Sequence, residues 1–178
     1  MLEKIQIDRD IRKAQTLPAS FYRSSEILKL LKETVFEKSW QFCAAKDDLH
    51  EGPSYLPFEF IPEFIPEPLL ISRDKTGDIH CLSNVCTHRG NLLAYEAGKG
   101  KVLSCRYHGR CFRLDGSFKS MPGFEGVEGF PTKRDNLSKI PFGEWAGLLF
   151  ASLNPESDFS DWIKPISERL SWLDFKSL

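Results

Sequence analysis

The chain is poor in histidine, carries almost no net charge and lacks long apolar runs. Only four of its 178 residues are histidines, which limits the number of metal sites that imidazole can build. A formal net charge of −1 gives no general attraction to nucleic acid. No apolar run approaches the roughly 20 residues of a membrane helix, and the charged start Met1-Leu2-Glu3-Lys4 has no apolar signal-peptide core. We therefore expect neither a membrane nor a nucleic acid among its partners.

Cysteine occurs five times, and an odd number of cysteines cannot pair completely within one chain. Free thiols fit a reducing compartment, so we expect a cytoplasmic protein. Cys43, Cys81 and Cys111 stand apart from the motif described next. We expect these three to be small, buried apolar side chains.

The other two cysteines each stand close to a histidine. The segments are Cys86-Thr87-His88, followed by Arg89-Gly90, and Cys105-Arg106-Tyr107-His108, followed by Gly109. A zinc finger groups two cysteines first and two histidines later, whereas here each pair mixes the two types. A Rieske [2Fe–2S] centre needs two thiolates on one iron and two imidazoles on the other, and glycine permits the tight loops that would present them. We interpret these four side chains as cluster ligands. The alternatives are a structural tetrahedral zinc site and four unrelated buried residues.

Both segments resemble the cluster loops of Rieske non-haem iron oxygenases, in the α subunit of the aromatic-ring-hydroxylating type. The similarity covers about residues 18–155. It includes Cys86–Asn91, Cys105–Arg110, Ser39-Trp40-Gln41, Ser72–Gly77 before Asn84-Val85, Asp115-Gly116 and Met121-Pro122. One departure is Arg110, which stands where the family usually has an aromatic residue. The resemblance implies a Rieske-type [2Fe–2S] cofactor bound by Cys86, His88, Cys105 and His108.

The resemblance also implies a role in electron transfer. Electrons would arrive from a reductase or a ferredoxin and leave through His88 or His108 to the catalytic domain of the same or a neighbouring subunit. Respiratory Rieske proteins carry an extra disulfide between their loops, but Asn91 and Tyr107 occupy the matching positions here. We therefore expect a reduction potential at the low end of the Rieske range, about −150 mV.

The oxygenase family also binds a mononuclear iron through two histidines and one carboxylate. Here only His50 and His80 remain, both before the cluster loops, and we expect them to be solvated surface residues. The chain alone should therefore only transfer electrons as part of an oxidoreductase, and we expect it to be a fragment without the catalytic domain. A stand-alone Rieske ferredoxin is the second reading, which the downstream gene sequence would distinguish. A structural zinc or interaction module is the third, and it would be colourless.

The pattern of the rest of the chain predicts a mainly β fold, of small antiparallel sheets with two cluster loops at one end. We expect an amphipathic helix over 24–38 and a short C-terminal helix around Trp162 and Trp172, with Ile163 and Leu170. Residues 1–39 form an N-terminal extension, 40–155 the Rieske domain and 156–178 a tail that could begin a catalytic domain. Hairpin turns are expected at Lys75–Asp78 and Asp115-Gly116, and a last strand at Leu148–Leu153. Edge strands and loops are expected around Pro53, Pro57, Pro62, Pro66 and Pro68.

Charged and aromatic residues also occur in and near the loops. Arg89, Arg106 and Arg110 predict a positive tip that steers an acidic partner, although internal ion pairs are an equal alternative. Trp40, Tyr107 and Phe112 are expected to pack in the core. Donation of the Tyr107 hydroxyl to a cluster sulfur is a less favoured reading.

Overall fold

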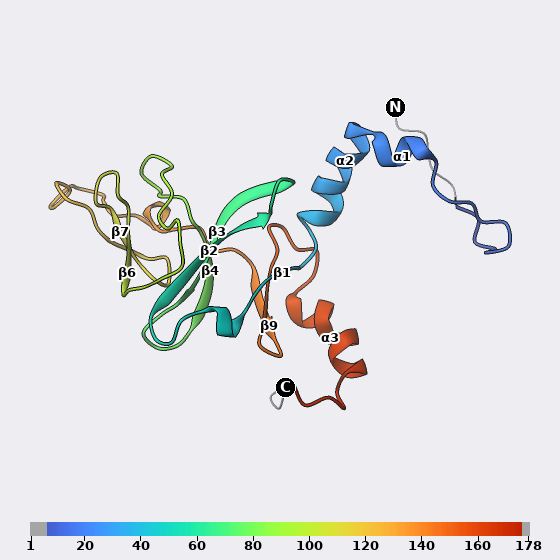
Figure 1. Ribbon diagram of the computed structural model, residues 1–178. Coiled ribbons are helices and arrows are strands. Elements are labelled where there is room, and N and C mark those ends of the chain that lie inside the picture. The colour runs from blue at the N-terminus through green and yellow to red at the C-terminus, as the bar shows by residue number, and fades with distance from the viewer. Residues whose placement is uncertain (1–6, 176–178) are drawn as a thin grey trace.

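The computed structural model describes residues 7–175 and consists mainly of short antiparallel strands, as expected (Figure 1). The first sheet has the order β1-β10-β9, formed by Gln41–Ala45, Leu148–Ala151 and Phe142–Trp145. The second has the order β4-β3-β2-β5, formed by Ile79–Ser83, Ile65–Arg73, Ser54–Ile61 and Gly98–Lys99. The third has the order β6-β7-β8, formed by Val102–Ser104, Cys111–Arg113 and Phe118–Ser120.

The proline-rich stretch contains the expected loops and an open edge, but more strand than expected. Pro53 and Pro62 lie in a bend and a turn. The rest forms β2 and β3, the two longest of the strands described, and β3 lies inside its sheet, so the expectation was wrong for β3. Pro57 and Pro68 pair with Leu70 and Glu59 between β2 and β3, and each lacks a ladder partner on the other side of its strand. Pro68 accepts a hydrogen bond from Asn84, just beyond the end of β4. β5 pairs only with Ser54 and Tyr55, so the outer edge of β2 is open at Pro57.

The two expected hairpin turns are present. Asp74 closes the turn between β3 and β4, since its carboxylate accepts hydrogen bonds from the backbone N–H groups of Thr76 and Asp78 at 2.9 and 3.1 Å. Between β7 and β8, Gly116 has a φ of 84°, which favours glycine, and Asp115 accepts a 2.8 Å hydrogen bond from the Ser117 N–H. These turns fix the register of the strands that carry the loops.

A compact apolar core lies between the second and third sheets. Phe112 on β7 is fully buried at its centre, and both loop cysteines belong to it. Its members are Leu70, Leu82, Cys86, Leu93, Ala94, Leu103, Cys105, Phe112, Leu114 and Leu137. The core therefore supports both loops from beneath, because each loop sends one buried side chain into it.

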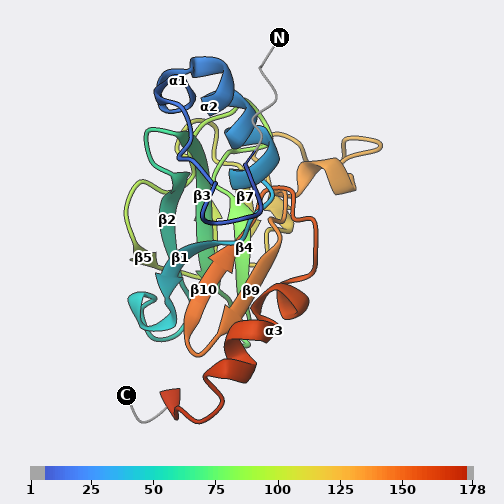
Figure 2. The same cartoon turned by 90° about the vertical axis from the view of Figure 1, so that its right-hand side faces the viewer.

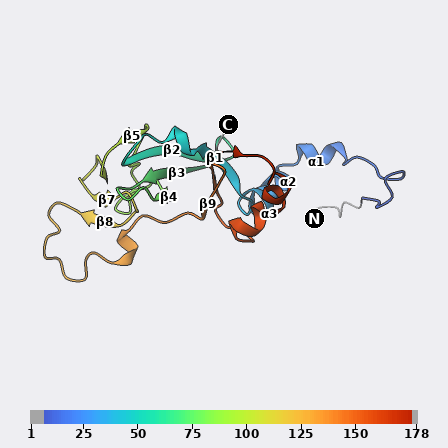
Figure 3. The same cartoon turned by 90° about the horizontal axis from the view of Figure 1, so that it is seen from below.

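The N-terminal helices project away from the sheets (Figures 1 and 3). The expected helix over 24–38 is present but divided into α2 (Ser25–Leu31) and a π-helical turn, η1 (Lys32–Phe36), after the short α1 (Ala19–Arg23). Ser24 caps α2, as expected, by accepting a 3.2 Å hydrogen bond from the N–H of Ile27. Several apolar residues of this segment are exposed, Leu28 by 52 % and Val35 by 45 %, whereas Phe36 at its end packs against the core.

The C-terminal helix is also present, as α3 (Phe159–Arg169), and packs beside β9 (Figure 2). Ile163 is buried, and the Phe159 ring lies against Gly143 and meets Trp40 edge-on at 5.2 Å. Trp172 lies beyond the helix and is exposed. The two remaining helical turns are η2 (Lys46–Asp48) and η3 (Lys133–Asp135). None of the helices between residues 7 and 175 has the length and apolar character needed to span a membrane.

Candidate metal centre

The first Cys–His segment forms a closed loop after β4. The N–H of Cys86 donates to the carbonyl of Asn91 at 2.8 Å, and the N–H of Gly90 donates back to the carbonyl of Cys86 at 3.0 Å. Buried Asn84 supports the base of this loop, because its side-chain amide makes two hydrogen bonds with the backbone of Ala94. The turn therefore fixes the backbone on both sides of His88.

The second segment repeats the same backbone pattern between β6 and β7. The N–H of Cys105 donates to the carbonyl of Arg110 at 2.8 Å, and the N–H of Gly109 donates to the carbonyl of Cys105 at 2.9 Å. Ser104 and Cys111 are paired in the sheet, so this loop is the tip of a β-hairpin. Two sequences that differ in spacing, C-x-H and C-x-x-H, thus share one hydrogen-bonded loop.

Both loops close through a glycine in the left-handed region, at a φ of 71° for Gly90 and for Gly109. A side chain there costs about 1–2 kcal/mol. A Cβ on Gly109 would also lie 3.2 Å from Cγ of Pro122, whereas nothing lies within 4 Å of a Cβ on Gly90.

Gly109→Ala is therefore expected to lower the free energy of unfolding by more than the matched variant Gly90→Ala, which has only the backbone cost of about 1–2 kcal/mol. Urea unfolding of the two variants, followed by fluorescence, measures this difference. A larger loss in Gly90→Ala would contradict the geometry of the two loops.

The two loop cysteines point into the core and toward each other. Cys86 and Cys105 are 2 % and 3 % exposed, and their thiols are within hydrogen-bonding reach. Burial raises the pKa of the Cys86 thiol, the backbone N–H of His88 acts in the opposite direction, and Cys105 raises it further. Two neighbouring buried thiols are suited to a metal, because metal binding removes their protons and compensates the charge of the thiolates.

The two histidines lie above the cysteines with their ring centroids 4.9 Å apart. The pKa of His88 is lowered, chiefly by burial and then by the neighbouring charges of His108 and Arg89, which favours the neutral imidazole that binds metals. Nδ1 of His108 is buried and has no hydrogen-bond partner within the described part of the chain. Buried polar atoms are normally satisfied, so this nitrogen fits a metal ligand, and the residues present fit a Rieske cluster.

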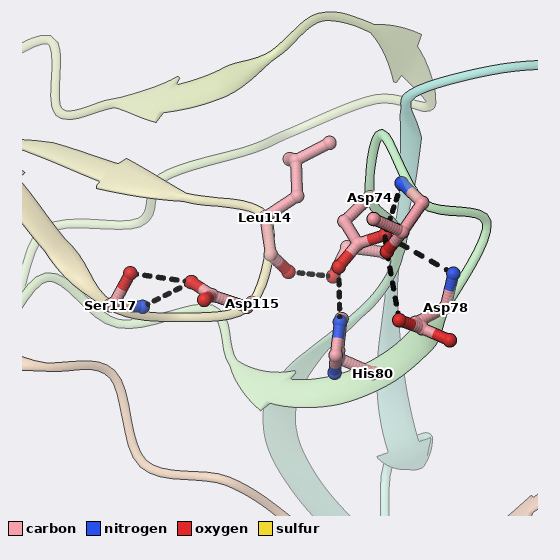
Figure 4. A network of polar contacts seen from close by, with 8 residues as sticks. Asp74, Asp78, His80, Leu114, Asp115 and Ser117 are labelled. Carbon is pink, nitrogen blue, oxygen red and sulfur yellow. Dashed lines mark hydrogen bonds and ion pairs between the residues drawn. The ribbon is translucent and has the colours of Figure 1, made fainter.

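Neither of the other histidines lies in these loops. His50 is exposed, as expected. His80 is not solvated, because its ring pairs with Asp74 at 3.0 Å and is only 20 % exposed, so the expectation for it was wrong (Figure 4). Burial opposes the ionisation of Asp74, but hydrogen bonds from Thr76, His80 and Asp78 hold its pKa well below the usual range. Between residues 7 and 175, no three His, Cys, Asp or Glu side chains converge tightly enough to hold a single ion.

The three other cysteines lie outside the loops. Cys81 is buried as expected, while Cys43 and Cys111 are half-buried. Burial raises the pKa of the Cys43 thiol to about 12, and it also raises that of Cys81. Both thiols are therefore protonated and poor nucleophiles near neutral pH.

Two of the three arginines expected at a positive tip of the loops are at the surface. Arg89 and Arg106 are exposed, and Arg106 lies over the Tyr95 ring at 5.5 Å. Tyr107 is 57 % exposed and stacks on His108 with ring centroids 3.8 Å apart, so the expectation that it packs in the core was wrong. Donation of its hydroxyl to a cluster sulfur stays a prediction. Trp40 and Phe112 are core residues, as expected.

Arg110 does not belong to the tip, because it is only 3 % exposed and forms an ion pair with Asp135. The alternative of internal pairing is correct for this arginine. Sequence reasoning missed Asp135, which is 25 residues away in the chain. The pattern Thr132-x-x-Asp135 could have predicted the capped turn η3, but nothing in it points to Arg110.

Comparison with known proteins agrees with this geometry. Residues 39–131, just over half of the chain, match the Rieske [2Fe-2S] domain family. The carnitine monooxygenase oxygenase subunit of Acinetobacter baumannii is 33% identical over 160 residues, which are 89% of this chain and 42% of the relative. The choline monooxygenase of Beta vulgaris is 30% identical over 82% of this chain and 32% of its own length.

Solved structures give the same result. The quaternary ammonium Rieske monooxygenase CntA superposes with a TM-score of 0.78 and 31% identity, over 89% of this chain and 44% of that one. Naphthalene 1,2-dioxygenase from Rhodococcus sp. superposes with a TM-score of 0.77 and 25% identity, over 88% of this chain and 36% of that one. The chain thus spans about two fifths of the length of the carnitine monooxygenase subunit and of CntA, and about one third of the length of choline monooxygenase.

Proposed function

The chain belongs to the Rieske [2Fe–2S] domain family, and we propose that it is the electron-entry domain of a Rieske non-haem iron oxygenase. The observation that carries the proposal is the pair of matching loops, which place two buried thiols beneath two adjacent imidazoles. The similarity to oxygenase subunits along most of this chain supports it.

In this proposal, Cys86 and Cys105 would hold one iron of a Rieske cluster, and His88 and His108 would hold the other. When bound, the cluster would supply one-electron transfer. The thiolates supply negative charge inside the core, and the neutral imidazoles keep the total charge low, so an added electron meets less repulsion than in an all-cysteine site. We assign the unpartnered Nδ1 of His108 as one of the iron ligands.

The exposed edges of the loops are the proposed entry and exit for electrons. Both histidine rings are only partly covered, so the ring nitrogen of each that does not bind iron can reach a hydrogen-bond acceptor on a partner. We propose that a reductase or ferredoxin donates the electron. A catalytic domain, in the same or a neighbouring subunit, then receives it through one of these rings.

We further propose that residues 40–155 form the Rieske domain, with 1–39 and 156–178 as extensions. The projecting α1 and α2, which expose Tyr22, Leu28 and Leu30, support a role for the first extension in packing against another part of the oxygenase. The cysteines at 43, 81, 86, 105 and 111 are all free, which supports a reducing, cytoplasmic environment.

Charge reversal at the loop edge tests the proposed donor contact. Arg106→Glu is expected to slow reduction of the cluster by an acidic plant-type ferredoxin about tenfold at low ionic strength, because it removes a favourable long-range attraction. Stopped-flow absorbance at several salt concentrations measures the rate, and the difference should shrink as salt rises.

The matched control is Arg169→Glu, which makes the same change of charge on an exposed residue in the last turn of α3. The first sheet lies between helix α3 and the third sheet, so the two sites are well separated (Figures 1 and 3). An equal effect of both substitutions, or an Arg106 variant with unchanged salt dependence, would show that the loop edge does not steer the donor.

A further inference from the structure

Arg110 is a buried cation directly behind the second loop. Its guanidinium carbon lies 5.1, 5.6 and 5.7 Å from three aromatic ring centroids, those of Phe118, Phe130 and Phe112. Arginine stays charged at every accessible pH, and a buried charge needs a partner. Its one carboxylate partner among the described residues is Asp135.

Asp135 connects this cation to the first loop. Its backbone carbonyl accepts a 2.9 Å hydrogen bond from the hydroxyl of Thr87, between Cys86 and His88, and a longer one of 3.4 Å from Arg110. Its carboxylate also accepts from the N–H of Thr132 at 2.7 Å, which holds η3 in place. One residue therefore contacts both cluster loops.

The two charges differ in their exposure to solvent. The Arg110 side chain is 4 % exposed, while that of Asp135 is 19 % exposed. Water screens the carboxylate more, so the positive charge dominates the field inside the loops.

We propose that Arg110 and Asp135 form a charge pair that sets the reduction potential of the cluster and holds its two loops together. This rests on the proposed function, since it assumes a cluster on these loops. Arg110 is a positioning residue and not an iron ligand. Its positive charge favours the reduced form of the cluster. Asp135 partly offsets that charge.

The test is redox titration of the full chain with its cluster. Arg110→Gln removes the cation and is expected to lower the equilibrium constant for reduction about tenfold, which corresponds to 59 mV for one electron. Asp135→Asn removes the offsetting charge and is expected to raise the constant, by about threefold because the carboxylate is more screened. The double variant should lie between the two single variants.

Two controls separate charge from structure. Arg110→Lys keeps the charge but not the planar fork, so its potential should stay within about threefold of the parent while its stability falls. Arg113→Gln removes an exposed arginine on β7, three residues after Arg110, and should change the reduction constant less than twofold. Thermal unfolding of each variant reports the structural part separately.

Shifts of the reduction potential that are opposite in sign for Arg110→Gln and Asp135→Asn support the charge pair. Shifts of the same sign, or none above twofold, overturn it even though the parent chain carries a normal cluster. If Arg110→Gln does not fold, an unchanged potential in Asp135→Asn overturns it. A parent chain that binds no iron–sulfur cluster overturns the ligand assignment and this inference with it.

Discussion

Cys105→Ser is expected to abolish the iron–sulfur cluster, leaving a protein without the visible absorption of the parent chain. The thiol is 3 % exposed, at the tip of the β6–β7 hairpin and within reach of Cys86. A serine hydroxyl is far less acidic than a thiol and a harder donor, so it cannot replace a thiolate on iron. Cys86→Ser is expected to have the same effect, because the two loops are equivalent in their backbone hydrogen bonds.

The chain contains its own controls for this result. Cys111→Ser changes a half-buried cysteine only six positions further along, and Cys81→Ser changes a fully buried one. Both variants should keep the iron and acid-labile sulfide content of the parent. Loss of the cluster in either control, or retention of a full cluster in Cys105→Ser, would contradict the assignment of ligands.

Phe112→Ala is expected to lower the free energy of unfolding by about 3–5 kcal/mol, the range for large aromatic residues truncated in a core. Phe112 is fully buried beneath both loops, and Arg110 lies over its ring at 5.7 Å. The substitution therefore removes apolar contacts and also one aromatic wall around a buried cation. Chemical denaturation monitored by fluorescence and circular dichroism measures the loss.

Phe42→Ala is the matched control, because this phenylalanine on β1 is 58 % exposed. Its truncation should cost less than about 1 kcal/mol. Equal losses of unfolding free energy in the two variants would show that the core between the second and third sheets does not dominate the stability of the fold. If Phe112→Ala loses the cluster at temperatures where the chain stays folded, the Phe112 ring is also needed for the geometry of the loops.

The two tight loops could be predicted from sequence because their geometry is local, whereas the assignment of their Cys and His side chains as ligands stays a proposal. Gly90 and Gly109 predict the tight turns, and the mixed Cys–His pairs before them indicate the Rieske family. Hairpin positions were equally accessible, since Asp115 and Gly116 form a turn through short-range hydrogen bonds.

The failures concern contacts that depend on how strands and turns are placed. Proline at position 68 suggested an edge or a loop, because a sequence does not reveal that a neighbouring strand ends where the missing N–H falls. His80 was expected to be solvated, although a turn brings Asp74 to its ring. For Arg110 the sequence left an exposed tip and an internal ion pair as equal alternatives, because its partner is supplied by a turn 25 residues later.

The exposed helix α2 shows a different limit. Its apolar spacing predicted an amphipathic helix, and the helix forms, but Leu28 and Leu30 remain exposed and no apolar side chain of the helix is fully buried. Periodicity thus identifies a face that can be buried without identifying what covers it.

The most direct test of histidine ligation is pulsed EPR of the reduced full chain with nitrogen-15 in its histidines. Two imidazole nitrogens, one each from His88 and His108, are expected to couple strongly to the unpaired electron, and neither His50 nor His80 should contribute. A spectrum with no strongly coupled histidine nitrogen, accompanied by a potential near the −400 mV that is typical of plant-type clusters, would contradict the account.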